Sequence, residues 1–299
     1  MSANLGLPTV EKNVIQLNVS VDHSRLRRLL NERVVLDDQS RERITNTVLI
    51  EGGYSFSEKW SADVFLSFVQ QIRNIDQFSR LVKSETKGIG DAVILLKYQL
   101  LKKNGLTWSI GAGPKIPTGA SDLRNESGLR YVADLQPGSG AFDLLLWTNA
   151  QTVIKSRPTM GIAFQNVISL KGVNNNYLGS ARYQFGNEWQ SSLSVSDRLN
   201  IKNLTLDPSL SVRYRKAFND EIDFSDLPST GGQWFFIEPS LTYWNNPDQH
   251  FSLSFSLPIY SEVVGTQLSP NLRVNVGFYR KIKLKDKKNE FVPNVNFTK

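Results

Sequence analysis

The chain has 299 residues, a formal net charge of +7 and no cysteine, and 40% of its residues are hydrophobic. No stretch approaches the roughly 18 consecutive apolar residues of a membrane-spanning helix, and a chain without cysteine can form neither disulfides nor thiolate metal sites. The basic excess gathers at residues 280–288, so we interpret it as a solvated tail and expect no nucleic-acid binding.

The N-terminal residues 1–6 show neither the basic nor the apolar region of a signal peptide, which by itself argues against export. The rest of the chain has the pattern of an exported protein. We therefore expect that a signal peptide has been removed.

Apolar and polar residues alternate along almost the whole chain, which is the pattern of strands with two different faces. The first third contains three such segments, at residues 15–21, 47–56 and 61–68. The middle contains four, at residues 91–100, 106–115, 142–151 and 160–164, the last of them less regular because Asn166 falls in the apolar register. The last third contains five, at residues 188–196, 204–215, 235–243, 251–259 and 272–278.

The connections between these twelve segments differ in length. Tight turns are predicted at residues 57–59, 102–105, 155–158, 200–203 and 246–248. Long polar connections are predicted at residues 23–43, 74–87, 118–139, 171–184, 218–231 and 262–270. Short periplasmic turns and long extracellular loops are typical of outer-membrane barrels.

A soluble β-sandwich or lipocalin-like barrel would also alternate. Its strands would average about 5–6 residues, shorter than most of these segments, and its core could not bury so many unpaired charges. The sequence therefore predicts an all-β protein: a transmembrane up-and-down antiparallel β-barrel of about twelve strands in the bacterial outer membrane. We expect a monomer surrounded by outer-membrane lipid, with a periplasmic segment at residues 1–12, the barrel at 13–283 and a basic tail at 284–299.

If the polar face lines the lumen, acidic and basic residues occur there in equal numbers. The acidic residues are Glu51, Asp63, Asp91, Asp143, Glu188, Asp207 and Glu238. The basic residues are Lys97, Lys115, Arg198, Arg213, Arg215, Arg273 and Lys281. A charge-selective pore would show an excess of one sign. The balance predicts cross-strand ion pairs that brace the wall and narrow the passage.

Three glycine- and proline-containing motifs follow one another in the middle of the chain. They are Gly88-Ile89-Gly90-Asp91, the stretch 113–119 with Pro117, Thr118 and Gly119, and the stretch 135–143 with Pro137, Gly138 and Gly140. Together with Leu257–Tyr260 and Gly265–Leu268, they resemble the outer-membrane family called MetA-pathway of phenol degradation, over roughly residues 45–280. The resemblance implies a barrel that acts as a transporter, with a link to uptake of aromatic compounds, and brings no catalytic residues. Taken on their own, the glycines and prolines of these motifs indicate strand ends and turns.

Catalysis has little support in the sequence. The enzyme alternative is an outer-membrane phospholipase, which needs a Ser–His pair. His23 and His250 are the two histidines of the chain, and Ser24, adjacent to His23, would point to the opposite face of a strand. We therefore expect no enzyme, no metal and no cofactor. The predicted function is a passive channel for small solutes, among them aromatic or hydrophobic ones. The alternative is a non-conducting structural or surface-interaction barrel whose lumen is filled by side chains.

Overall fold

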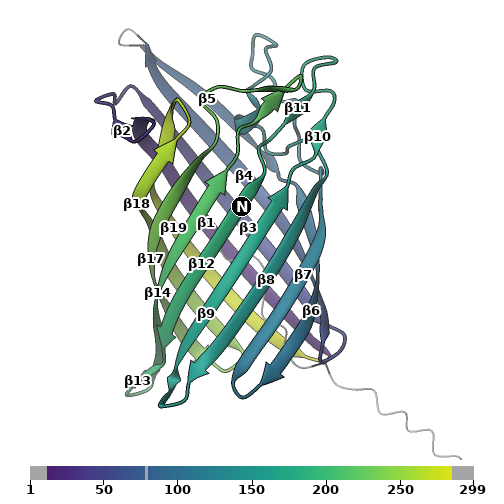
Figure 1. The fold of residues 1–299 in the computed structure, drawn as a ribbon, viewed down its shortest axis with the longest axis vertical. Helices are drawn as coiled ribbons and strands as arrows, with labels where there is room; N and C mark the ends of the chain where they lie inside the picture. Colours follow the sequence, from purple (N-terminus) through teal and green to yellow (C-terminus); the bar gives the residue numbers. More distant parts are fainter. Residues whose placement is uncertain (1–11, 78–79, 285–299) are drawn as a thin grey trace, which may run out of the picture.

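Within residues 12–77 and 80–284, which the computed structural model describes, twelve long strands pair edge to edge in a closed antiparallel ring (Figure 1). The strands are β1 (Val14–Asn31), β3 (Arg41–Ser55), β4 (Trp60–Gln77), β6 (Ala92–Lys103), β7 (Leu106–Ile116), β8 (Asp143–Ile154), β9 (Arg157–Leu170), β12 (Glu188–Asp197), β14 (Leu204–Ala217), β17 (Gly232–Asn246), β18 (Gln249–Val263) and β19 (Thr266–Lys283). The first and last of these strands pair with each other, from Val14 opposite Lys283 to Asn31 opposite Thr266. The ring is therefore complete, and the predicted fold is confirmed.

The outer face of the ring is apolar. Val48, Ile50, Leu66 and Leu96 belong to the predicted apolar face, and all four are exposed. A soluble protein would not display such a surface on every strand, because large apolar patches drive association. The band has the character of the surface that an outer-membrane barrel turns toward lipid.

Aromatic side chains border this band at both ends. At the short-turn end, the rings of Trp60 and Tyr98 lie 4.7 Å apart. At the other end, Trp189, Tyr214, Phe235 and Tyr260 form a row with neighbouring centroids 5.4, 4.9 and 6.0 Å apart. Rows of this kind are typical of the two membrane–water interfaces.

The five predicted tight turns all lie at one end of the barrel, where β1 begins and β19 ends (Figure 1). Three of the six predicted long connections are wrong in extent, because strands run through much of them. β1 and β3 continue into residues 23–43, β4 and β5 (Arg80–Ile89) occupy most of 74–87, and β18 and β19 meet at a tight turn within 262–270. These strand extensions carry polar residues on both faces, so the alternation that reveals a strand disappears there.

The three remaining long connections cover the same end of the barrel as those extensions. One of them, between β7 and β8, contains the short 3₁₀ turn η1 (Ala133–Leu135). The other two contribute to a small second sheet made of β10 (Val173–Asn174), β11 (Tyr183–Gln184), β15 (Glu221–Ile222) and β16 (Ser225–Asp226). The short strands β2 (Val34–Val35) and β13 (Leu199–Ile201) extend hairpins of the ring. No helix in the described part of the chain is long and apolar enough to span a membrane.

The predicted segment 1–12 and tail 284–299 lie outside the described residues except for Lys12 and Leu284.

Candidate functional site

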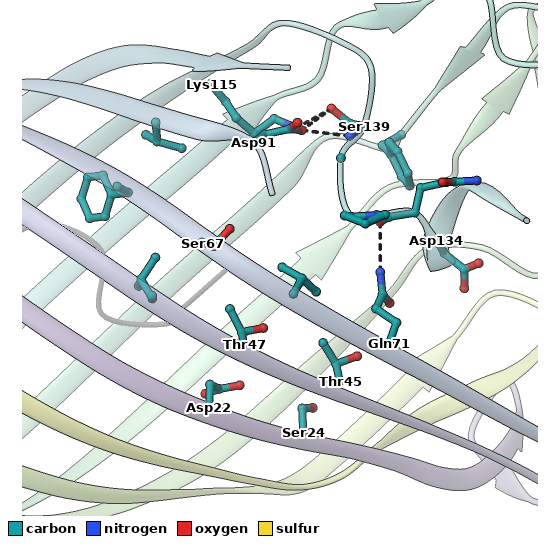
Figure 2. A pocket seen from close by; sticks show the side chains of 18 of the residues that line it. Asp22, Ser24, Thr45, Thr47, Ser67, Gln71, Asp91, Lys115, Asp134 and Ser139 are labelled. Carbon is teal, nitrogen blue, oxygen red and sulfur yellow. Dashed lines mark hydrogen bonds and ion pairs between the residues drawn. The ribbon is translucent and has the colours of Figure 1, made fainter. Parts of the chain in front are cut away.

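The connection between β7 and β8, residues 117–142, folds into the barrel and contacts the inner face of β3, β4 and β5 (Figure 2). Ala133 and Leu135 of η1 are buried there. The Gln71 side chain donates to the carbonyl of Gln136 over 3.0 Å, and the Thr86 hydroxyl donates to the carbonyl of Leu135. We call residues 117–142 the inserted loop.

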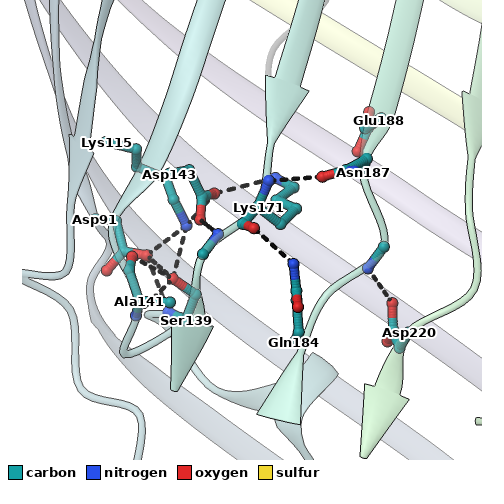
Figure 3. Close-up of polar contacts among 12 residues, drawn as sticks. Asp91, Lys115, Ser139, Ala141, Asp143, Lys171, Gln184, Asn187, Glu188 and Asp220 are labelled. Atoms are coloured by element: carbon teal, nitrogen blue, oxygen red, sulfur yellow. Dashed lines mark hydrogen bonds and ion pairs between the residues drawn. The ribbon is translucent and has the colours of Figure 1, made fainter. Parts of the chain in front are cut away.

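Asp91 anchors both ends of the inserted loop (Figures 2 and 3). Its Oδ1 accepts from the backbone N–H of Gly119 over 3.1 Å, and its Oδ2 accepts from the backbone N–H and the hydroxyl of Ser139 over 2.9 and 2.7 Å. Lys115 adds a charged partner, with its Nζ 2.9 Å from Asp91 Oδ2 and 2.8 Å from an Asp143 oxygen. One buried carboxylate thus ties a loop start, a loop end and a strand end together.

Two glycines of these motifs are closely surrounded, Gly138 by the backbone of Gly119 and Gly90 by the side chain of Ser67. A Cβ added to Gly138 would lie 2.4 Å from the carbonyl oxygen of Gly119, and one added to Gly90 would lie 2.3 Å from Ser67 Oγ. Thr118 completes the join, because its hydroxyl donates to the Gly90 carbonyl and accepts from the Ala92 N–H. The three motifs noted in the sequence therefore assemble at one place in the lumen wall, although they are separate along the chain.

A cavity of about 550 Å³ lies in the lumen beside the inserted loop (Figure 2). Its lining is apolar on one side, where Leu49, Phe65, Val69 and Val93 contribute from β3, β4 and β6. Charged and polar side chains line the remainder. The volume falls in the range of roughly 300–1,000 Å³ that small-molecule sites occupy.

The apolar side of this cavity continues into a buried cluster on the inner wall. The cluster comprises Phe65, Val93, Leu95, Leu145, Trp147 and Val167. This cluster was not predicted, since the polar face was expected to line the lumen throughout. The signal was present at Ala92–Leu96 and Leu144–Trp147, where apolar residues are consecutive and so occupy both faces of the strand.

Ion pairs cross between neighbouring segments around the wall at the level of the cavity. The closest approaches are 2.8 Å for Lys115–Asp143, 3.3 Å for Lys171–Asp143, 2.9 Å for Arg215–Glu188, 2.8 Å for Arg213–Glu238 and 2.6 Å for Arg273–Asp22. We call this set, with Lys115–Asp91, the charged belt (part of it is shown in Figure 3). The predicted cross-strand ion pairs are confirmed.

Other predicted lumen residues lie nearer the short-turn end. Glu51, Asp63 and Lys97 are completely buried, and Lys97 Nζ is 2.5 Å from Asp63 Oδ2. Arg198 is exposed and pairs with Asp207 over 2.6 Å close to the β12–β14 turn, so it lies at the rim.

Four charged residues that were not predicted also line the cavity: Asp22, Arg43, Asp134 and Lys171. Arg43 lies in a strand extension that was expected to be loop, Asp134 lies in the inserted loop, and Lys171 directly follows β9. Asp22 lies one residue beyond the predicted segment 15–21 and could have been found, because it continues the alternation of β1 by one step. The other three carry no such signal.

The histidines do not contribute to this site. His23 is exposed and its Nδ1 lies 2.8 Å from Asn46 Oδ1, whereas Ser24 lines the cavity, so the two side chains lie on opposite faces of β1. His250 stacks on Tyr279 at the short-turn end, with the ring centroids 4.6 Å apart.

A closed ring of twelve strands, an apolar outer band between aromatic borders and an ion-paired lumen define an outer-membrane β-barrel. The chain belongs to the family described as Putative MetA-pathway of phenol degradation, whose model matches residues 55–269.

The fold is shared with solved membrane barrels. An outer membrane channel from Pseudomonas putida F1 is 13% identical, with a TM-score of 0.67 over 93% of this chain and 97% of that chain. The β domain of the Bordetella autotransporter BrkA is 9% identical, with a TM-score of 0.50 over 89% of this chain and 99% of that chain. A comparison with curated proteins found no match.

Proposed function

We propose that this barrel is a passive channel for small organic solutes with apolar parts. The observation that carries the proposal is the lumen cavity of about 550 Å³, which combines an apolar wall with a polar one. A pore for inorganic ions has no need of buried aromatic and aliphatic side chains on its inner surface. A solute with an apolar part, in contrast, would shed water from that part against Phe65 and Val93.

The same arrangement supports transport without covalent chemistry. His23 and Ser24 cannot act as a nucleophile and base pair, because they lie on opposite faces of the wall. The acidic side chains of the lumen are paired with basic side chains on neighbouring strands. Such pairing suits the rigid wall of a passage.

A second candidate is a non-conducting barrel that serves a structural or surface-interaction role. The complete burial of Gln16, Glu51, Asp63 and Lys97 toward the short-turn end favours it, because a wide water-filled passage would expose such side chains.

Planar bilayer recording on the purified protein separates the two functions. A channel is expected to give discrete conductance steps in KCl and to let small aromatic solutes enter proteoliposomes. An inert bilayer together with impermeable proteoliposomes would contradict the channel.

The paired wall charges predict weak preference between small cations and anions. Replacing Arg213 and Arg215 by Ala leaves Glu238 and Glu188 without their cations, which is expected to shift reversal potentials toward cation selectivity. Unchanged reversal potentials in the double variant, at measurable conductance, would place both arginines away from the pathway.

A further inference from the structure

The charged side chains that line the lumen cavity are not balanced, although the wall as a whole is. Among the residues that the structure describes, the basic lining residues are Arg43, Lys115, Lys171, Arg215 and Arg273, and the acidic ones are Asp22, Asp91 and Asp134. The difference, five against three, is two positive charges. It arises because Glu188 and Asp143, which pair with Arg215 and Lys171, do not themselves line the cavity.

The exposure of the paired side chains agrees with this asymmetry. The Arg215 side chain is 31% exposed and its partner Glu188 is 15% exposed, and for Lys171 and Asp143 the values are 11% and 1%. In both pairs the basic side chain is thus the more exposed partner, and it is the one that lines the cavity. Each base keeps donors available, because an ammonium has three N–H groups and a guanidinium has five.

The basic heads and the apolar wall face each other across the lumen. Arg215 is on β14 and Phe65 is on β4, and these strands are six steps apart in the ring of twelve. Lys171 follows β9, next to Glu188 of β12, and so lies on the same side as Arg215. The cavity touches both sides.

We propose that this cavity is a binding site for small organic monocarboxylates. The carboxylate lies at Lys171 and Arg215, and the apolar body of the ligand packs on Phe65, Val93 and Leu49. A carboxylate fits two basic donors because charge-assisted hydrogen bonds are about twice as strong as neutral ones. A fully polar anion would leave the apolar wall unused, and a cation would meet the excess positive charge. This inference names the solute class of the proposed channel and in that sense rests on it.

The first test uses three ligands that share a benzene ring and differ in the charge and the hydrogen-bonding atoms of the head group. Isothermal titration calorimetry on the detergent-solubilised wild-type barrel compares benzoate, benzamide and benzamidine. Benzoate is expected to bind at least about tenfold more tightly than neutral benzamide, and benzamidine is expected to bind most weakly. Equal affinities, or a preference for benzamidine, would overturn the proposal without any variant.

The second test removes the basic heads. In Lys171→Gln, Asp143 keeps its 2.8 Å contact with Lys115, and the double variant R215Q/E188Q leaves no carboxylate unpaired. Both are expected to lose about tenfold in benzoate affinity while benzamide affinity stays the same. The matched control is R157Q/D197N, an Arg–Asp pair whose residues do not line the cavity, which should change neither. Retained migration as a folded band on unheated gels shows that each variant forms the barrel.

The two proposals fail separately. Conductance in KCl without any charge preference among the three ligands would refute the carboxylate site and leave the channel standing. Charge-dependent benzoate binding in a barrel that conducts nothing would leave the site standing and refute the channel.

Discussion

At the scale of single residues, Lys97 and Asp63 form an ion pair between two side chains that are not exposed at all. Lys97 Nζ also lies 5.7 Å from the centroid of the Trp147 ring. Two charges that are buried away from water are tolerated only when each lies close to the other. Removal of one member of a buried pair destabilises a protein by about 3–5 kcal/mol. Exposed pairs contribute roughly 0–1 kcal/mol.

Asp63→Asn is therefore expected to lower the free energy of unfolding by about 3–5 kcal/mol. Urea unfolding in phospholipid vesicles, followed by tryptophan fluorescence, measures it. The matched control is Asp197→Asn, which removes the carboxylate partner of the exposed Arg157 and is expected to cost at most about 1 kcal/mol. Equal losses in the two variants would contradict the burial argument.

Asp220 is the titratable residue of the loops with the clearest pH consequence. Its carboxylate accepts from the Tyr183 hydroxyl over 2.5 Å and from the Gly186 N–H over 2.8 Å, which joins two loops through the small second sheet. Burial is the main cause that raises the pKa of Asp220 above its ordinary value of 3.8, and nearby Asp134 adds to the rise. The folded loops therefore favour the protonated acid more than the unfolded chain does.

Stability from this group is fully present below the ordinary pKa of 3.8 and is lost as the pH rises toward the raised pKa of the folded state. Asp220→Asn is permanently neutral, so its loops should not show this loss. Hydrogen exchange at residues 183–186 should show wild-type protection falling relative to the variant as pH rises. Asp226→Asn, an exposed position on β16, is the control and should follow the wild type. A constant ratio between wild type and D220N would refute the assignment.

At the scale of elements, the inserted loop depends on contact between two backbones. A Cβ on Gly138 would lie 2.4 Å from the Gly119 carbonyl oxygen and 2.5 Å from its carbon, and backbone atoms cannot move aside cheaply. Gly52 on β3 offers a contrast, because a Cβ there meets nothing within 4 Å.

Gly138→Ala should displace the inserted loop from the inner wall, whereas Gly52→Ala should not. Trypsin cleavage after Arg124 and Arg130, both within the loop, is expected to accelerate only in the first variant. Larger or noisier conductance in that variant would agree with a loop that narrows the passage. Identical digestion of the two variants would show that Gly138 tolerates a side chain.

Much of this architecture could be predicted from alternation, because lipid outside and water inside impose opposite requirements on the two faces of each strand. Prediction failed where the two faces of a strand do not meet lipid on one side and water on the other. Beyond the membrane, Arg25 pairs with Glu42 on two strand extensions whose faces are both polar. The apolar cluster on the lumen wall was not predicted because both faces of the strand are apolar there, with Val93 on one face and Ile94 on the other.

The candidate site was harder to predict from the sequence than the strands were. Asp91, Thr118 and Gly138 stood out as motif residues, but their meeting depends on the inserted loop turning inward, which periodicity does not encode. The ion pairs were expected from charge balance. The asymmetry of the cavity lining depends on which partner of each pair reaches farther into the lumen, and only the structure gives that information.

At the scale of the whole molecule, loop length and the position of the strand ends set the orientation in the membrane. Long connections face outward and short turns face the periplasm in barrels of this type. Val14 of β1 and Lys283 of β19 pair at the short-turn end. We therefore expect both ends of the barrel-forming chain to lie on the periplasmic side.

Cysteine labelling of intact cells tests that orientation, because this sequence has no cysteine of its own to react. Ser127→Cys in the inserted loop is expected to react with an impermeant maleimide, and Asn104→Cys in the β6–β7 turn is expected to react only after the cells are broken. The reverse pattern would mean that the barrel is inserted the other way.

The seam between β1 and β19 has a consequence for how the molecule forms. It joins residues about as far apart in the chain as the barrel allows, since Val14 pairs with Lys283. Non-local pairing of this kind makes folding slow, because loop-closure entropy is lost before the contacts form. Until β19 is in place, β1 and β18 each present an unpaired edge, a template for aggregation. The nascent barrel must therefore be shielded until its last strand arrives, and a chain that ends before β19 should be cleared rather than inserted.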